Sequence, residues 1–370
     1  MKAKDIALKI DQMYPLGLAQ DWDNVGLLVG DPQKAVRDIL LTIDVTNDVV
    51  AEARRLNIDL ILSYHPVIWD GLKKITAEWP TRVVYELVRS GIAVFSIHTA
   101  LDAAIGGVND GLAEIVGIVE GKPIGDYVQS PAGDNYKLVV FVPAESLAAV
   151  SNAVFAAGAG AIGNYSHCGF GAQGTGTFLP QEGAKPAIGR KGRLQKVAEI
   201  RFEAIVPEQS LADVIAAMKK AHPYETPAFD IFKLYDPQTP FGLGRIGDLG
   251  RPMRLARILE RVKDVTGAKA LGVIGQENRL VRRAAVCAGS CGPIINSVIA
   301  AGADLYVTGE LKHHQALAAQ EAGLTCICLS HTVSERFILK KIAKQLQKQL
   351  KGIKIRASKK DADPFKWKNV

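Results

Sequence analysis

The sequence has few cysteines and no long apolar run. Its five cysteines are an odd number and none shows the C-x-x-C spacing of common zinc sites, so we expect reduced thiols without a disulfide framework. No apolar run approaches the roughly 18 residues that a membrane-spanning helix needs. The first residues, MKAKDIALKIDQMYP, have the pattern of an amphipathic helix with acidic residues, unlike a signal peptide. These absences predict a cytoplasmic protein without a membrane segment.

Nucleic-acid-binding motifs are also missing, although the chain is basic. The net charge is +7, and much of the excess lies in the tail KKIAKQLQKQLKGIKIRASKK. Because no aromatic residues interleave with these lysines, we interpret the tail as the solvated face of a helix. Walker and dinucleotide-binding fingerprints are absent as well. The charge therefore does not predict a nucleic-acid partner.

Two internal repeats organise the 370 residues, which are too many for one ordinary core. In the first repeat, FVPAESLAAVSNAVFAAGAG from Phe141 resembles IVPEQSLADVIAAMKKAHP from Ile205. In both, a strand leads to Val-Pro, to a serine that suits a helix N-cap, and to an apolar helix. A further strand follows each helix. This pattern predicts a ferredoxin-like α+β domain at residues 128–236.

The second repeat flanks that domain. IDLILSYHPVIW near residue 58 resembles ADLYVTGELKHH from Ala303, and SGIAVFSIHTALD from Ser90 resembles AGLTCICLSHTVSER from Ala322. The strands are apolar on both faces and alternate with helices, which favours buried and largely parallel sheets. We therefore predict an α/β fold in which duplicated lobes, residues 1–127 and 237–370, form one composite domain around the insertion.

Four candidate metal ligands follow the strands of this repeat: His65, Asp102, His331 and Glu335. Ligands collect at the carboxyl ends of strands in open α/β sheets. If HTVSER opens a helix, His331 and Glu335 lie one turn apart on the same face. Imidazole and carboxylate together suit zinc, iron or manganese, and such an ion can activate water for hydrolysis.

Other polar residues have weaker patterns. His98 and Glu310 are candidate catalytic residues: His98 precedes Asp102 by four positions and would either orient it or pack beside it, and Glu310 would line the pocket. For His313 and His314, the sequence leaves open whether they line the pocket or lie exposed on a helix. In the insertion, GNYSHCGFGAQGTG and HPYETPAFD have the glycine and polar residues of ligand-binding loops, although no known fingerprint matches them.

Several long motifs resemble those of the GTP cyclohydrolase 1 type 2 family, also called Nif-three-like proteins. They are DWDNVGLLVGD, LTIDVTNDVVAEA, YHPVIW, HTALDAAIGGVND, VTGELKHHQAL and SHTVSE, in this order along the chain. GAGAIGNYSHCGF and AHPYETPAFDI match the PII/CutA-like domain that is inserted in the longer members. The resemblance extends from the first helix to the terminal DPFKW.

The resemblance implies two metal ions per chain, a toroidal homohexamer, and metal-dependent opening of the purine ring of GTP. His65, Asp102, His331 and Glu335 match the family's metal ligands. The family usually has His-His-Pro where this chain has Tyr64-His65-Pro66, so one ligand is missing and one or two ions are expected. The competing hypothesis is a metal-binding or small-molecule-sensing assembly protein without turnover.

Overall fold

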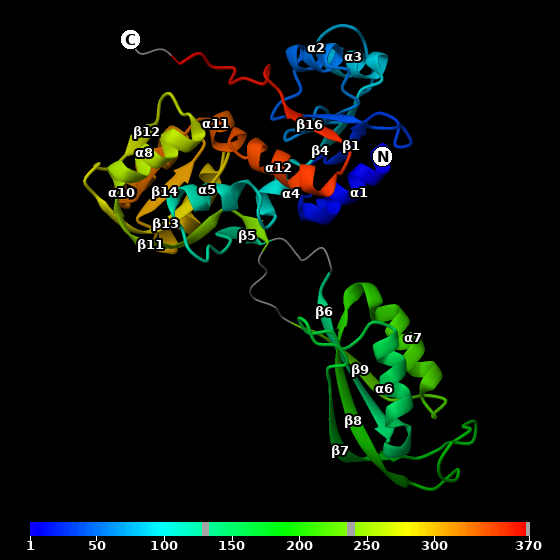
Figure 1. The fold of residues 1–370 in the computed structure, drawn as a ribbon. Coiled ribbons are helices and arrows are strands. Elements are labelled where there is room, and N and C mark those ends of the chain that lie inside the picture. The colour runs from blue at the N-terminus through cyan, green and yellow to red at the C-terminus, as the bar shows by residue number, and fades with distance from the viewer. Residues whose placement is uncertain (128–132, 235–240, 368–370) are drawn as a thin grey trace. The chain divides into compact units, whose positions relative to one another are not determined.

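The computed structural model describes residues 1–127, 133–234 and 241–367 (Figure 1). Its contacts divide the chain into two compact units, one made of Met1–Val128 with Thr239–Val370 and the other of Gln129–Gln238. The first unit is therefore discontinuous in sequence. A short antiparallel pair, β5 (Gly125–Tyr127) with β10 (Gly242–Leu243), lies where the chain leaves and re-enters this unit.

The first sheet of this unit has the order β1-β4-β3-β2-β16. Its three central strands are parallel, β16 is parallel to β2, and β1 is antiparallel to β4. The bounds are β1 (Gly26–Val29), β2 (Asp38–Thr42), β3 (Leu60–Ser63), β4 (Ala93–Ser96) and β16 (Lys354–Ala357). Every residue of β3 and β4 is buried, because these strands have neighbours on both faces. Polar side chains can therefore appear only where the strands end.

The second sheet has the matching order β12-β15-β14-β13-β11. Again three central strands are parallel, with an antiparallel strand on each side. The bounds are β11 (Arg245–Arg254), β12 (Gly272–Ile274), β13 (Leu280–Cys287), β14 (Leu305–Thr308) and β15 (Thr325–Cys328). Both sheets have five strands with a parallel centre, and the prediction of a mixed α/β protein is confirmed.

The two halves exchange elements, which the division at residues 127 and 237 does not anticipate. Helix α5 (Val108–Val116) comes from the first half, yet Leu112 and Val116 belong to the core beneath the second sheet. Conversely, α12 (Leu339–Gln349) contributes Ile342 and Leu346 to the core of the first sheet, and β16 joins that sheet's edge (Figure 1). The lobes in space therefore do not coincide with the lobes in sequence.

The remaining helices of the first unit surround these sheets. They are α1 (Ala3–Met13), α2 (Asn47–Arg55), α3 (Arg82–Ser90), α4 (His98–Ala103), α8 (Leu255–Thr266), α9 (Ile295–Ala300), α10 (His313–Glu321) and α11 (His331–Arg336). Thr46 caps α2, its hydroxyl accepting from the amide of Val49 at 3.3 Å. In α12, apolar residues face the core while lysines of the basic tail lie on the opposite face, as the solvated-helix interpretation predicts.

The second unit is a four-stranded antiparallel sheet with two helices. The order of elements is β6 (Asn135–Pro143), α6 (Leu147–Ala156), β7 (Gly169–Phe178), β8 (Gln195–Pro207), α7 (Leu211–Ala221) and β9 (Phe229–Lys233). The strands are arranged β7-β8-β6-β9. Alternate residues of β6 and β8, such as Val140 and Phe202, pack into one core with both helices. The opposite face of the sheet is the less buried one.

All five cysteines are free, as predicted. None of the helices within residues 1–127, 133–234 and 241–367 is long and apolar enough to span a bilayer.

Candidate metal centre

His65 lies directly after β3, at the carboxyl edge of the first sheet. The ladder between β2 and β3 continues past both strands, because the amides of Tyr64 and His65 donate to Thr42 and Ile43 at 2.9 and 3.0 Å. This pairing fixes the backbone at the point where the side chain leaves the sheet. The His65 ring is nearly buried, with 12% of its side chain exposed.

His331 and Glu335 lie one turn apart on α11, as their spacing predicts. The helix begins after Ser330, a non-glycine residue with a positive φ of 75°. Such a conformation costs on the order of 1–3 kcal/mol and persists only where surrounding contacts hold it. Here the Ser330 amide donates to Gly309 at 2.9 Å and its hydroxyl donates to Asp363 at 3.3 Å. The strained residue directs His331 toward His65.

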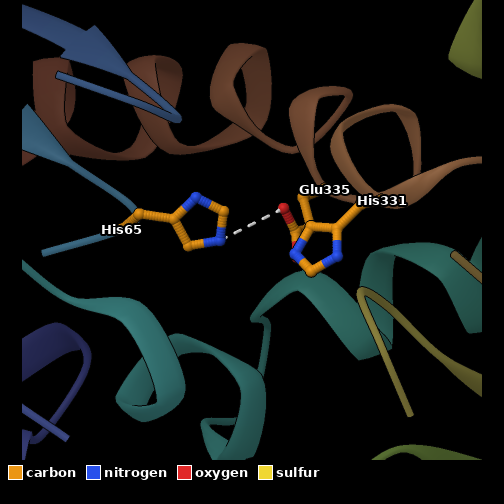
Figure 2. A group of neighbouring side chains, drawn as sticks. All are labelled: His65, His331 and Glu335. Atoms are coloured by element: carbon orange, nitrogen blue, oxygen red, sulfur yellow. Dashed lines mark ion pairs between the residues drawn. The ribbon is translucent and has the colours of Figure 1, made fainter. Parts of the chain in front are cut away.

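His65, His331 and Glu335 come together from the two halves of the chain (Figure 2). One potential ligand atom from each residue lies within 4.8 Å of those of the other two. Glu335 is central: its Oε2 is 3.6 Å from His65 Nε2, and its Oε1 is 3.3 Å from His331 Nε2. No other such group of histidine, cysteine, aspartate or glutamate occurs in the part of the chain that the structure describes.

The Glu335 carboxylate is buried, with one oxygen that lacks a hydrogen bond. The residue is 2% exposed, and its Oε2 has no hydrogen-bond partner among the described residues. Leaving a buried charged acceptor unpaired is costly, so such an atom calls for a ligand. A divalent ion between Oε2 and the imidazole nitrogens would satisfy it. The donor set therefore fits a borderline divalent metal.

Each histidine of this region has a carboxylate on its Nδ1. The pairs are His65–Asp44 at 2.9 Å, His98–Asp23 at 2.9 Å and His331–Glu310 at 3.0 Å. A carboxylate only accepts, so each Nδ1 carries the proton and Nε2 is directed elsewhere. Metal-binding histidines typically show this arrangement, because the carboxylate fixes the tautomer and makes the free nitrogen more basic.

The charges around His65 and His331 favour the protonated forms of these two rings while no ion is present. The hydrogen bond to Glu335 is the largest influence on His331 and raises its pKa to about 10, against the effect of burial. Burial lowers the pKa of His65, but the hydrogen bond that its Nδ1 donates to Asp44 and the charge of Glu335 outweigh it and leave the pKa raised. Protons therefore occupy positions that a cation would take, and the two compete.

Asp102 does not join this group but is bound to Tyr64. The Tyr64 hydroxyl donates to Asp102 Oδ1. Burial is the largest influence on Asp102 and raises its pKa to about 6, although the hydrogen bond from Tyr64 and the charges of His98 and His65 lower it. Three of the four predicted ligands, His65, His331 and Glu335, thus form one group. The fourth, Asp102, is instead hydrogen-bonded to Tyr64.

Tyr64 fills the space beside the histidines. It is 2% exposed, and its ring makes edge contacts with His65 and His98 at centroid distances of 5.2 and 5.6 Å. Burial, followed by the charges of Asp102 and Glu335, raises the pKa of the phenol well above its ordinary value of 10. The phenol is therefore neutral.

The predicted catalytic residues take other partners. His98 binds Asp23 through Nδ1, so that nitrogen does not orient Asp102, and its ring lies 5.1 Å from that of His65. Glu310 follows β14 and holds His331. His313 and His314 begin α10, where their rings contact each other at 5.6 Å.

Asp23 and Asp44 are functional candidates to which the sequence analysis assigns no role, although both lie in the motifs quoted above. Asp44 follows β2 at the same sheet edge as His65, so the strand-end rule would have found it. Asp23 lies in the loop before β1, where no periodic signal identifies it.

Gly289 lies against the side chains of the cluster. A Cβ there would lie 2.7 Å from Glu335 Oε1, and the residue has a φ of +71°. We expect Gly289→Ala to displace Glu335 and lower the metal content. The left-handed backbone should also cost the variant about 1–2 kcal/mol of folding stability. Gly267→Ala is the control, because it has a φ of +72° with no atom near its Cβ. Equal metal content in both variants, measured by elemental analysis, would contradict the expectation.

Comparisons with known proteins identify the family of the chain. The family model Duf34/NIF3 (NGG1p interacting factor 3) matches residues 1–364. A GTP cyclohydrolase 1 type 2 homolog of Mycobacterium tuberculosis is 42% identical over 322 residues, which cover 85% of this chain and 83% of that protein. Among solved structures, a Bacillus cereus protein related to NIF3 is 37% identical with a TM-score of 0.78, and Staphylococcus aureus protein SA1388 is 27% identical with a TM-score of 0.84; each match covers 99% of both chains. The chain therefore belongs to the Duf34/NIF3 family.

Proposed function

We propose that the protein binds a divalent metal ion through His65, His331 and Glu335. The observation that carries the proposal is the unpartnered Oε2 of the buried Glu335 carboxylate, which lies 3.6 Å from His65 Nε2. The Nδ1–carboxylate pairs of both histidines support it. Zinc, iron and manganese all suit these ligands.

In this proposal, Asp102 belongs to a second metal site of lower affinity. Its Oδ1 accepts from Tyr64, so a second ion would have to displace that hydrogen bond. Tyr64 supplies a neutral phenol, which is a poor ligand. We therefore assign one firmly held ion to each chain, with the second weak or absent.

The activity we propose is metal-dependent hydrolysis of a purine nucleotide or a similar heterocycle. The ion would supply a Lewis acid and an activated water. Trp69 is 54% exposed with its ring 5.3 Å from His98, and Trp22 is 65% exposed at 5.9 Å. Exposed indole rings can stack on a flat heterocycle. The name of the Mycobacterium tuberculosis relative, GTP cyclohydrolase 1 type 2 homolog, supports the same class.

A turnover screen tests the proposed activity. Metal-reconstituted protein is incubated with GTP and other purine nucleotides, and products are separated by liquid chromatography. We expect turnover that His331→Ala abolishes and His313→Ala retains, because His313 lies at the start of α10 beside His314 and outside the cluster. Tight metal binding without any turnover would favour a binding protein instead.

Metal affinity should rise with pH. His331 has a pKa of about 10 in the metal-free protein, so below that pH an ion must displace its proton. Between about pH 6.5 and 8 we expect the apparent affinity for zinc to rise about tenfold per pH unit for each proton released. Titrations in buffers of different ionisation enthalpy count these protons. Zinc binding that releases no protons would contradict the assignment of His331 as a ligand.

The alternative function is small-molecule sensing without turnover, in which the inserted unit binds the ligand. The order of its elements supports assigning residues 128–236 to a separable, ferredoxin-like PII/CutA-like domain. An open cavity of about 730 Å³ within this unit favours the alternative.

The family relationship also supports a homo-oligomer, for which the toroidal hexamer is our specific proposal, and a cytoplasmic location without membrane or nucleic-acid partners. Light scattering of the full chain measures the mass. A monomer at micromolar concentration would exclude the hexamer.

A further inference from the structure

The inserted unit contains a cavity of about 730 Å³, within the ordinary size range of small-molecule sites. Residues of β6, β7 and β8 line it on the face of the sheet opposite the helices, together with residues 179–188 and 224–228. Much of the lining is apolar, including Phe141, Phe178 and Ile188. Such a surface suits the body of a small organic molecule.

One carboxylate of this cavity is buried and incompletely bonded. Glu199 is 8% exposed, and its Oε1 accepts from the Tyr224 hydroxyl at 3.0 Å. Oε2 receives no hydrogen bond from the residues that the structure describes, and it remains accessible to solvent. This oxygen lies against Gly176, where a Cβ would be only 2.0 Å away. Gly176 makes room for the Glu199 carboxylate. The position of the carboxylate therefore depends on both β7 and β8.

No ion pair involves Glu199 within the described residues, although Lys185 and Arg201 also line the cavity. His222 donates from Nε2 to Phe141 at 3.0 Å and accepts at Nδ1 from the amide of Tyr224 at 3.1 Å, which fixes its neutral form. The cation of Arg201 is directed to Glu203, to which its Nε donates at 2.8 Å. Within the described residues, Glu199 therefore has no ion pair. A largely buried carboxylate without a counter-charge favours a cationic ligand.

We infer that this cavity binds a small amphipathic amine, whose ammonium group pairs with Glu199 Oε2 and whose apolar body packs on Phe141, Phe178 and Ile188. An ammonium group supplies both the missing positive charge and the missing donors. A metal ion is a poorer occupant, because no group of three or more metal-ligating side chains lies here among the described residues. This inference deepens the sensing alternative above and does not depend on the metal centre.

Isothermal titration of the full chain with tryptamine tests the inference, and tryptophol serves as the neutral analogue of the same shape. We expect saturable binding of tryptamine and at least about tenfold weaker binding of tryptophol. Glu199→Gln should weaken tryptamine binding by a similar factor while tryptophol binding stays unchanged. Asp230→Asn is the control, because it also removes a carboxylate, from an exposed position on β9 outside the cavity.

Three outcomes would overturn the inference: no saturable binding of tryptamine, equal binding of the two probes, or tryptamine binding that Glu199→Gln leaves intact. Metal content is measured on the same preparations. If it is unchanged in Glu199→Gln while tryptamine binding is lost, the cavity and the metal centre are independent. A wild type that binds tryptamine but takes up no zinc on reconstitution would refute the proposed metal centre alone.

Discussion

Glu335→Gln is expected to remove nearly all bound metal while the fold remains intact. Glu335 is the residue that both His65 and His331 approach, and glutamine keeps its shape but loses its charge. Loss of an outer partner of a metal ligand typically weakens affinity about 10–100-fold. Loss of a ligand should therefore exceed about 100-fold. Elemental analysis and a competition titration with a zinc chelator measure the change, and circular dichroism reports the fold.

Two variants make this result specific. Glu310→Gln removes the negative charge beside His331 Nδ1 but keeps an acceptor there, so it should lower affinity only within the range of an outer partner. Glu52→Gln removes another buried carboxylate, which bonds Ser358 and lies outside the cluster, and it should leave metal content unchanged. If Glu335→Gln binds as much metal as the wild type, the assignment of the centre is wrong.

Tyr64→His is expected to raise the metal content from one ion per chain toward two. The wild-type phenol is neutral, so it binds an ion poorly. Its hydroxyl also donates a hydrogen bond to Asp102, so the carboxylate is not free to bind an ion. Histidine at this position would supply an imidazole nitrogen and release Asp102 at the same time. Elemental analysis after dialysis against limiting zinc gives the stoichiometry. The smaller side chain leaves a partly empty buried site, so a moderate fall in melting temperature should accompany the gain.

Tyr64→Phe separates these two effects. It frees Asp102 without supplying a ligand and should keep the content at one ion per chain. A second ion in Tyr64→Phe would show that the hydrogen bond alone excludes it. Two tightly bound ions in the wild type would contradict the assignment altogether. If iron then gave a visible charge-transfer band, Tyr64 itself would be a tyrosinate ligand.

Sequence periodicity was sufficient for the α/β class. Strands such as β3 and β4 are apolar throughout because both faces are covered, and this property is local to each segment. The exchange of α5, α12 and β16 between the halves has no such local signal. An apolar stripe shows that a helix has a buried face, but not which of two similar cores receives it.

The metal centre was also predicted only in part from the sequence. His65 follows a strand, and His331 and Glu335 are four residues apart on a helix, so spacing was enough to nominate them. Their meeting, and the contact of Tyr64 with Asp102, depend on how the two halves pack. The pairing of Asp23, Asp44 and Glu310 with ring nitrogens, at 2.9–3.0 Å, likewise depends on the tertiary structure.

Glu199 shows the limit most clearly. In the strand VAEIRFEAIV, alternation places it on the face opposite Phe202 and predicts an ordinary solvent-facing glutamate. The structure buries it instead, because Gly176 lets its carboxylate approach the next strand and Tyr224 covers one oxygen. The sequence by itself determined the strands, the helices and the residues at their ends. Only the tertiary structure decided which charges are enclosed, because burial depends on segments that are distant along the chain.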